Sequence, residues 1–390
     1  MAEKIYLCIV ATAYMLSASI IVINNEYSLE KVVSTLLMIL MGYIVGYFVY
    51  KKMCKNTYEK NRLVLAIDKH KFNIFMFIYM IIMIIYALKT GDGKAESQNL
   101  FSSSIFASLW VPDGIFSFYY FKCREDYKKQ TLVNTILYLA YKMLLGWTGV
   151  ILIVFLYELS YRLRNKKYNL LKVAAISAAS LIGGGVLYKY LYPLKYMIRY
   201  AGTGFNGVVK NLTMLEGIKN LASRLNKLRT TLFVNKNIDA IVDRYVSQRI
   251  DLLEVKSAFR PIIPSELFKN KVFSNIGSCI YNTESGYSGM NITDNCSILY
   301  YYRLLFKCDY LSFFISILLT VFIFWLFKYM TNMIQDKPGQ FDFLFFIFIF
   351  TGWCVCGSLE NLIMQTYIKF IFFIPLIMLT GVGKLRIRRR

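Results

Sequence analysis

Apolar runs of about 20 residues, separated by short basic loops, constrain this chain more than any other feature. Of its 390 residues, 57% are hydrophobic and only 18% are charged, which is outside the range of soluble globular domains. A helix needs about 20 apolar residues to cross roughly 30 Å of hydrocarbon. The chain is therefore predicted to be an all-α polytopic membrane protein.

Seven apolar runs have the length and composition of membrane-spanning helices, at residues 5–23, 32–50, 72–88, 173–192, 310–330, 342–358 and 365–382. Residues 101–121 are also apolar, but Pro112, Asp113 and Gly114 interrupt them. Such a break frees backbone polar groups in mid-membrane, which is tolerated only where protein or water satisfies them. We count this region as one discontinuous span.

Residues 131–161 are too long for one helix and short for two, and the flanking charges decide between them. Lysine and arginine residues at 122–129 and at 162–167 both favour the cytoplasm. This requires a hairpin of two short helices that turns near Gly146 and Trp147.

These assignments give ten membrane spans, with both termini in the cytoplasm. The loop 51–71 with seven Lys/Arg, the loop 162–172 with five and the arginine-rich tail then all lie inside, as the positive-inside rule requires. The predicted organisation is an N-terminal transmembrane bundle (1–192), a large extracytoplasmic loop (193–309), and three C-terminal spans with a basic tail (310–390).

The polar segment 193–309 is the largest interruption of the apolar pattern. Its 117 residues contain 16 Lys/Arg against 9 Asp/Glu, a net charge of +7. A cationic loop beside transmembrane helices favours an anionic, lipid-linked substrate. The whole chain carries +23, but its basic residues cluster in short loops that orient helices, so no nucleic-acid partner is predicted.

Residues 213–233 predict an amphipathic helix within this loop. Its apolar side chains recur at helical spacing, at Met214, Ile218, Leu221, Leu225, Leu228 and Leu232. Arg224 and Arg229 then fall at the two edges of the apolar stripe. Either the helix lies along the bilayer with a solvated basic face, or one of these arginines turns into a cavity and binds a phosphate through its planar guanidinium.

Further cations lie near the predicted membrane surface. Arg199, Arg260 and Arg303 together form a candidate cradle for a pyrophosphate, which would stabilise a departing diphosphate electrostatically. Lys142 lies inside the predicted hairpin, where an ionisable group indicates either function or an acidic partner.

Asp294 supplies an acidic group in front of the apolar run 298–306. It either caps the helix that enters the membrane or orients and deprotonates a hydroxyl. The only histidine, His70, lies in a predicted cytoplasmic loop, so chemistry outside would lack a histidine base.

The eight cysteines show no C-x-x-C pair and no Cys/His ligand spacing, so no metal site is predicted. Cys279 and Cys296 both fall in the large loop. A disulfide between them is an open alternative if that loop is extracytoplasmic.

This layout resembles the oligosaccharide repeat-unit polymerases of bacterial surface polysaccharide assembly, the Wzy-type O-antigen polymerases, which belong with the GT-C glycosyltransferases. The local matches are Leu221-Ala222-Ser223-Arg224, Thr293-Asp294-Asn295 and Gly357-Ser358-Leu359-Glu360. The hairpin turn Gly146-Trp147-Thr148 departs from the family pattern, which often has a basic residue there. Lys142 lies one helical turn earlier.

The resemblance implies glycosyl transfer on the periplasmic side of the bacterial inner membrane. A growing glycan on undecaprenyl diphosphate is the donor and a new lipid-linked repeat unit is the acceptor. The site residues would be Asp294, Arg224 and Arg229 for catalysis, and Arg199, Arg260, Arg303 and Lys142 for the diphosphate. It implies no metal and no cofactor, and as protein partners a chain-length regulator and a flippase.

Two other functions remain open. An O-antigen ligase has the same fold class, but its family typically uses an outer histidine that is absent here. A flippase for lipid-linked sugars would move its substrate without chemistry, but the 117-residue polar segment is long for such a transporter.

Overall fold

The computed structural model describes residues 2–55, 63–90, 112–147, 149–163, 169–199, 212–259, 275–286, 293–355, 357–363 and 373–387. Five of the described helices are long and apolar enough to cross a membrane, namely α1 (Ala2–Ile23), α2 (Leu29–Lys55), α3 (Lys69–Thr90), α8 (Leu170–Arg199) and α15 (Tyr310–Ile334). Each overlaps one of the predicted spans. The protein is therefore mainly helical and has the character of a transmembrane protein.

Shorter helices occupy the other predicted spans. They are α5 (Pro112–Cys123), α6 (Lys128–Leu144), α7 (Val150–Leu163), α16 (Asp342–Ile347) with the π-helix η3 (Phe348–Val355), and α18 (Phe373–Leu379). The predicted segments 101–111 and 364–372 lie outside the described residues. The predicted count of ten spans thus remains a prediction.

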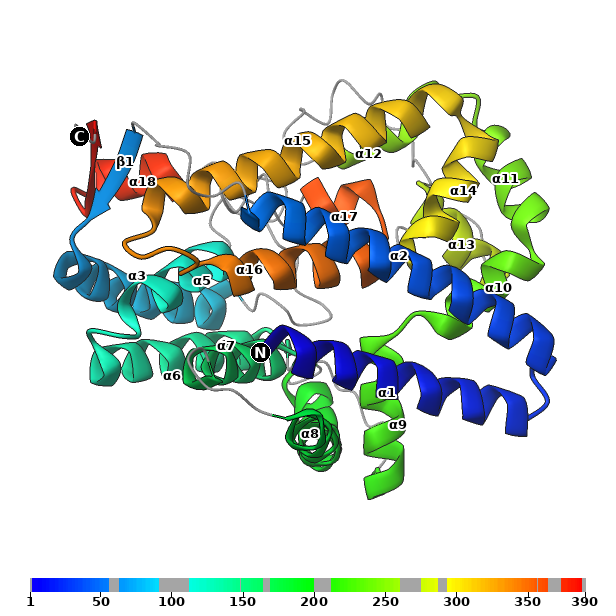
Figure 1. The fold of residues 1–390 in the computed structure, drawn as a ribbon, viewed down its shortest axis with the longest axis horizontal. Coiled ribbons are helices and arrows are strands. Elements are labelled where there is room, and N and C mark those ends of the chain that lie inside the picture. Colours follow the sequence, from blue (N-terminus) through cyan, green and yellow to red (C-terminus); the bar gives the residue numbers. More distant parts are fainter. Residues whose placement is uncertain are drawn as a thin grey trace.

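The direction of α8 sets it apart from the other long helices. In Figure 1, α1, α2 and α15 run across the page, whereas α8 is seen nearly end-on below α7. The axis of α8 therefore crosses theirs steeply. Helix α8 also continues through Pro193 to Arg199, beyond the predicted end of its span at residue 192.

Helices α6 and α7 form a hairpin in the region 131–161. The chain turns at Gly146, whose φ of +69° belongs to the left-handed region that glycine adopts without a steric penalty. Helix α5 packs beside this hairpin, and Phe116 of α5 stacks on Tyr138 of α6 with 3.9 Å between the ring centroids.

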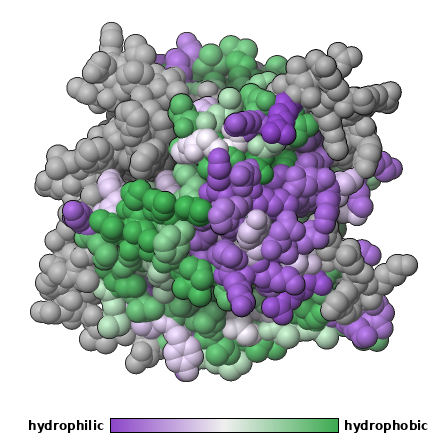
Figure 2. Space-filling model, turned by 90° about the vertical axis from the view of Figure 1, so that its left-hand side faces the viewer, coloured by the Kyte–Doolittle hydropathy of each residue, from purple (hydrophilic) through white to green (hydrophobic). Residues whose placement is uncertain are grey.

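A two-stranded antiparallel sheet corrects the expectation of an all-α fold. Strand β1 (Leu63–Ile67) pairs with β2 (Gly383–Ile387), with Leu63 opposite Ile387. The pairing joins the basic loop after α2 to the C-terminal tail, so these two segments lie at the same end of the molecule. Figure 2 shows that end, where a broad hydrophilic surface lies beside a hydrophobic one.

The described parts of the polar segment fold into short helices, most of which lie toward the opposite end of the long axis (Figure 1). They are α9 (Met214–Leu225), α10 (Leu228–Lys236), α11 (Ile238–Val246), α12 (Leu253–Phe259), α13 (Ile276–Ser285) and α14 (Ile298–Cys308), with α17 (Leu359–Ile363) packed against α12. We call α10 to α14 together with α17 the outer lobe.

A buried carboxylate joins the helices of the outer lobe. Glu254 is fully buried and accepts hydrogen bonds from the Ile276 backbone N–H at 3.1 Å and from the Tyr301 hydroxyl at 2.8 Å. Its own backbone N–H donates to the Tyr245 hydroxyl. Burial raises the pKa of Glu254 to about 7, although both donors favour its charged form.

The amphipathic helix predicted at 213–233 is broken at Asn226. The side chain of Asn226 is buried, and its Nδ2 donates to the Ser17 hydroxyl of α1 at 2.8 Å and to the Ala222 carbonyl. Its Oδ1 accepts from the Leu228 N–H. These bonds end α9 and start α10, because Asn side chains compete with helical backbone hydrogen bonds.

Candidate functional site

A cavity of about 1020 Å³ lies between α5, the α6–α7 hairpin, α8, α9 and η3. Most of its wall is apolar or made of small residues, including Leu152, Ile176, Gly183, Leu344 and Ile347. The charged side chains of the described wall are Asp113, Lys142, Lys195 and Arg224. This volume is at the upper end of ligand pockets, ~300–1,000 Å³, and such a wall fits a large amphiphilic ligand.

Lys142 and Asp113 form an ion pair in this wall. Lys142 lies in the last turn of α6 and Asp113 in the first turn of α5, with 2.6 Å between Nζ and Oδ1. The hydroxyl of Tyr138 donates to the same carboxylate oxygen at 2.6 Å, and Lys142 Nζ lies 4.6 Å from the Trp147 ring centroid. A buried cation needs such partners, so the fold fixes a positive charge at the cavity.

Close packing of α8 on α9 adds two more cations. A Cβ on Gly217 would lie 2.4 Å from the carbonyl oxygen of Gly185, so both positions need glycine for the two helices to touch. The contact brings the Arg224 guanidinium to 5.5 Å from the ring centroid of Tyr188. Lys195 lines the cavity from the same helix as Tyr188.

The π-helix η3 forms another part of the wall. π-Helices are rare and frequently occur at functional sites. Thr351 of η3 lines the cavity, and its hydroxyl is 3.1 Å from the Tyr6 hydroxyl of α1. This contact links the cavity wall to α1.

Asp294 is placed elsewhere and does not cap the helix that follows it. Helix α14 begins at Ile298, with Ser297 in the N-cap position. Asp294 instead accepts hydrogen bonds from Lys227 Nζ and from the Thr230 hydroxyl, both at 3.0 Å. It therefore ties the start of α10 to the chain before α14, and it is not among the described residues that line the cavity.

Arg229 and Arg303 also lie outside the described cavity wall. Arg229 is 74% exposed and its guanidinium is 3.3 Å from a carboxylate oxygen of Glu26. Arg303 is exposed on α14, where it donates to the side-chain oxygen of Asn235 at 3.4 Å. Neither arginine therefore lines the cavity that Lys142 lines.

The remaining predicted cations are only partly described. Arg260 and the side chain of Arg199 lie outside the described residues. Of the predicted site residues, the structure brings Lys142 and Arg224 together at one cavity. Cys279 and Cys296 are buried thiols, so the disulfide left open by the sequence is not formed.

Sequence reasoning missed three residues of this site. Asp113 was considered only as part of the break in the apolar run. An ionisable residue inside a membrane span indicates function whether it is a lysine or an aspartate, so the rule that identified Lys142 applies to Asp113 as well. Lys195 lies just beyond the predicted end of its span, which the helix passes. Thr351 gave no signal, because a lone threonine in an apolar run is ordinary.

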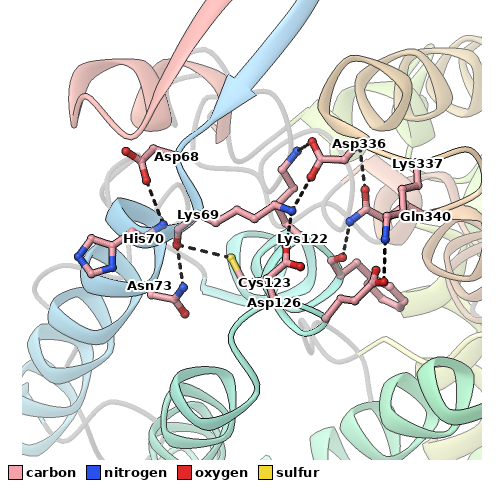
Figure 3. A network of polar contacts seen from close by, with 12 residues as sticks. Asp68, Lys69, His70, Asn73, Lys122, Cys123, Asp126, Asp336, Lys337 and Gln340 are labelled. Atoms are coloured by element: carbon pink, nitrogen blue, oxygen red, sulfur yellow. Dashed lines mark hydrogen bonds and ion pairs between the residues drawn. The ribbon is translucent and has the colours of Figure 1, made fainter.

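A second polar cluster lies at the end of the molecule that carries the sheet (Figure 3). Lys122 is 2% exposed, and its Nζ lies 2.6 Å from Asp336 and 2.5 Å from the Ile334 carbonyl. Lys69 bridges Asp336 at 2.8 Å and Asp126 at 2.5 Å. Burial would raise the pKa of Asp336, but hydrogen bonds from Lys122 and Lys69 hold it below its ordinary value. This cluster joins α3, α5 and the end of α15.

No family model matches the chain, and neither the curated proteins nor the solved structures include a significant match. The described residues contain no group of three or more His, Cys, Asp or Glu side chains that could hold a metal ion. The function must therefore be argued from the cavity itself.

Proposed function

We propose that this protein is a polymerase of lipid-linked oligosaccharide repeat units, and that the cavity holds the diphosphate end of its donor. The observation that carries the proposal is the convergence of Lys142, Lys195 and Arg224 on a largely apolar cavity, where Asp113 is the one acidic residue among the described lining residues. Three cations against one anion favour a ligand with two negative charges or more, and the apolar wall favours a lipid chain.

The proposed reaction is glycosyl transfer. A hydroxyl oxygen of the acceptor glycan attacks the anomeric carbon of the donor and forms the new C–O bond. The bond from that carbon to the diphosphate oxygen breaks, and the electron pair leaves with undecaprenyl diphosphate. The hydroxyl proton passes to water or to the departing diphosphate. Cations fixed where the leaving group gains charge lower the barrier.

Lys142 and Arg224 have distinct parts in this proposal. Lys142 lies 2.6 Å from Asp113, and Tyr138 donates a 2.6 Å hydrogen bond to the same carboxylate oxygen, so the charge of Lys142 needs little reorganisation when the leaving group develops charge. Arg224 is exposed above Tyr188 and offers a planar, bidentate group to a phosphate. Asp113 is a positioning residue, since it acts through Lys142.

Orientation completes the proposal. We place the outer lobe and the hairpin turn in the periplasm, and the β1–β2 sheet with both termini in the cytoplasm of a bacterial inner membrane. The basic loop and basic tail that pair through the sheet then lie on the side that the positive-inside rule favours. The GT-C-like bundle of ten spans and the absence of a metal requirement belong to the same proposal.

Transport is the second candidate function. A charged cavity enclosed by apolar helices also suits a protein that carries lipid-linked sugars across the membrane without chemistry. The described helices of the long polar segment that pack around Glu254 are better explained by an enzyme that positions a second glycan.

The test uses purified protein, an undecaprenyl-diphosphate-linked repeat unit and lipid A core, incubated with a chelator and resolved on a gel. A ladder of glycan lengths with released undecaprenyl diphosphate supports the polymerase. A single unit transferred to lipid A core means a ligase. Unchanged substrate that nevertheless crosses the bilayer of proteoliposomes means a transporter.

A further inference from the structure

A second hollow lies between α1 and α2 and, like the first cavity, borders η3. These two helices meet at their connecting loop and diverge toward the start of α1, like the arms of a V (Figure 1). The groove between them has a volume of about 660 Å³, and Phe350 of η3 contributes to its lining. Its apolar lining residues are Leu7, Val10, Ala11 and Met15 from α1 and Leu36, Ile39, Leu40 and Ile44 from α2.

The charged residues of the described groove lining lie at one end. Because α1 and α2 are antiparallel, the first turn of α1 and the last turns of α2 lie at the same end, and Lys4 and Lys51 line the groove there. Glu3 also lines it, but its carboxylate accepts a hydrogen bond from the Tyr50 hydroxyl at 3.2 Å. Both lysines are exposed, and Lys51 Nζ is 5.5 Å from the Tyr47 ring centroid.

We propose that this groove binds one anionic phospholipid, with its acyl chains along the apolar part and its phosphate at Lys4 and Lys51. Basic pockets between transmembrane helices on the cytoplasmic side are suited to anionic headgroups. The tyrosines near the charged end match the preference of tyrosine for the headgroup level of a bilayer. The groove shares no lining residue with the cavity proposed for glycan transfer, and the proposal does not depend on that function.

The size and polarity of the groove select this occupant. A soluble anion would leave the apolar walls exposed, and a neutral lipid would leave Lys4 and Lys51 without a partner in the ligand. A phospholipid with a net negative charge satisfies both parts at once. The volume of about 660 Å³ is within the usual range of ligand sites, ~300–1,000 Å³.

The experiment is native mass spectrometry of the purified full chain in detergent, titrated with phosphatidylglycerol or with phosphatidylcholine of the same acyl chains. We expect phosphatidylglycerol to bind at least about tenfold more tightly. The double variant Lys4→Ala/Lys51→Ala should bind both lipids equally. The control Lys128→Ala/Lys129→Ala removes two exposed charges at the start of α6, away from the groove, and should keep the preference.

A second variant tests the groove itself. Ala11→Trp adds an indole to the exposed wall of α1 and leaves both lysines in place, so it should lower phosphatidylglycerol binding about tenfold. Equal binding of the two lipids to the wild type would overturn the proposal, as would a preference retained by the double lysine variant. Wild-type binding by Ala11→Trp would show that the lipid binds the lysines without entering the groove, which also overturns it.

Discussion

Two lysine–aspartate pairs at opposite ends of α5 are nearly identical in geometry and differ in what surrounds them. Lys142 meets Asp113 at the start of α5, and Lys122 near its end meets Asp336, each with 2.6 Å between nitrogen and oxygen. Both lysines are 2% exposed. The first pair lines a cavity of about 1020 Å³. The second is closed by the Ile334 carbonyl and by Lys69.

The difference shows that a buried ion pair does not by itself identify a binding site. Lys122 pairs with Asp336 and also donates to the Ile334 carbonyl, so it can hold α5 against the end of α15. Lys142 lies beside open space that water or a ligand can fill. The same chemistry therefore supports structure at one end of α5 and, in our proposal, binding at the other.

Lys142→Met should have the largest effect, a loss of about 1000-fold in the rate of glycan polymerisation. Removing one preorganised group that stabilises developing negative charge costs about 100- to 1000-fold. The melting temperature should change by only a few degrees, because Asp113 keeps the hydrogen bond from Tyr138 and lines a cavity that water can fill. Polymerisation is measured by product ladders and unfolding by thermal scans in detergent. A normal ladder from this variant would refute the proposed role of Lys142.

Lys122→Met is the matched variant at the other end of α5, and its main effect should be on stability. The change leaves the Ile334 carbonyl without its Lys122 donor, which costs about 1–3 kcal/mol, while Asp336 is 40% exposed and still pairs with Lys69. We expect a clearly lower melting temperature and lower yield, with near-normal activity for each folded molecule. A large loss of activity without a loss of stability would erase the distinction between the two pairs.

Arg224→Ala and Arg229→Ala compare an arginine that lines the cavity with an arginine on the surface. Arg224 lines the cavity, so its loss should lower kcat/KM about 30-fold, or about 2 kcal/mol. Arg229 is 74% exposed beside Glu26, and its loss should change kcat/KM less than about twofold. Equal losses from both variants, measured under matched substrate concentrations, would mean that the two arginines act in one site.

Hydropathy and charge predicted much of the helical framework. The long apolar runs gave α1, α2, α3, α8 and α15, and the flanking lysines and arginines gave the α6–α7 hairpin with its turn at Gly146. These features depend on local composition and helix length, which the sequence shows directly. The sheet was missed because a five-residue strand in a basic tail has no partner until the chain is folded.

The site was harder to predict, because helical periodicity does not show where a helix ends. The apolar spacing continues through Asn226, so Arg224 and Arg229 appeared to share one helix. The bonds of Asn226 to α1 separate them, and such tertiary bonds have no local signature. Likewise, Lys142 was found as an intramembrane cation, but its pairing with Asp113 depends on how α5 packs on the hairpin.

The smallest predicted effect is a change in the free energy of unfolding with pH. It comes from a third buried ionisable group, Glu254 in the outer lobe. Its pKa is raised to about 7 by burial, so folding favours the protonated form. The stabilisation is complete below the unfolded pKa, ~4.3, and is lost as the pH rises through about 7. Between about pH 6 and about pH 8 the free energy of unfolding should fall by about 1 kcal/mol.

Glu254→Gln should remove this dependence, because the amide keeps an oxygen for the Ile276 N–H and has no proton to lose near neutral pH. Thermal unfolding of both proteins at several pH values, followed by a probe in the outer lobe, provides the measurement. Glu254 is fully buried and has no cationic partner among the described residues, and it thus differs from Asp113 and Asp336, which are each paired with a lysine. If the wild type became more stable with rising pH, Glu254 would have a cation close to it in the folded protein.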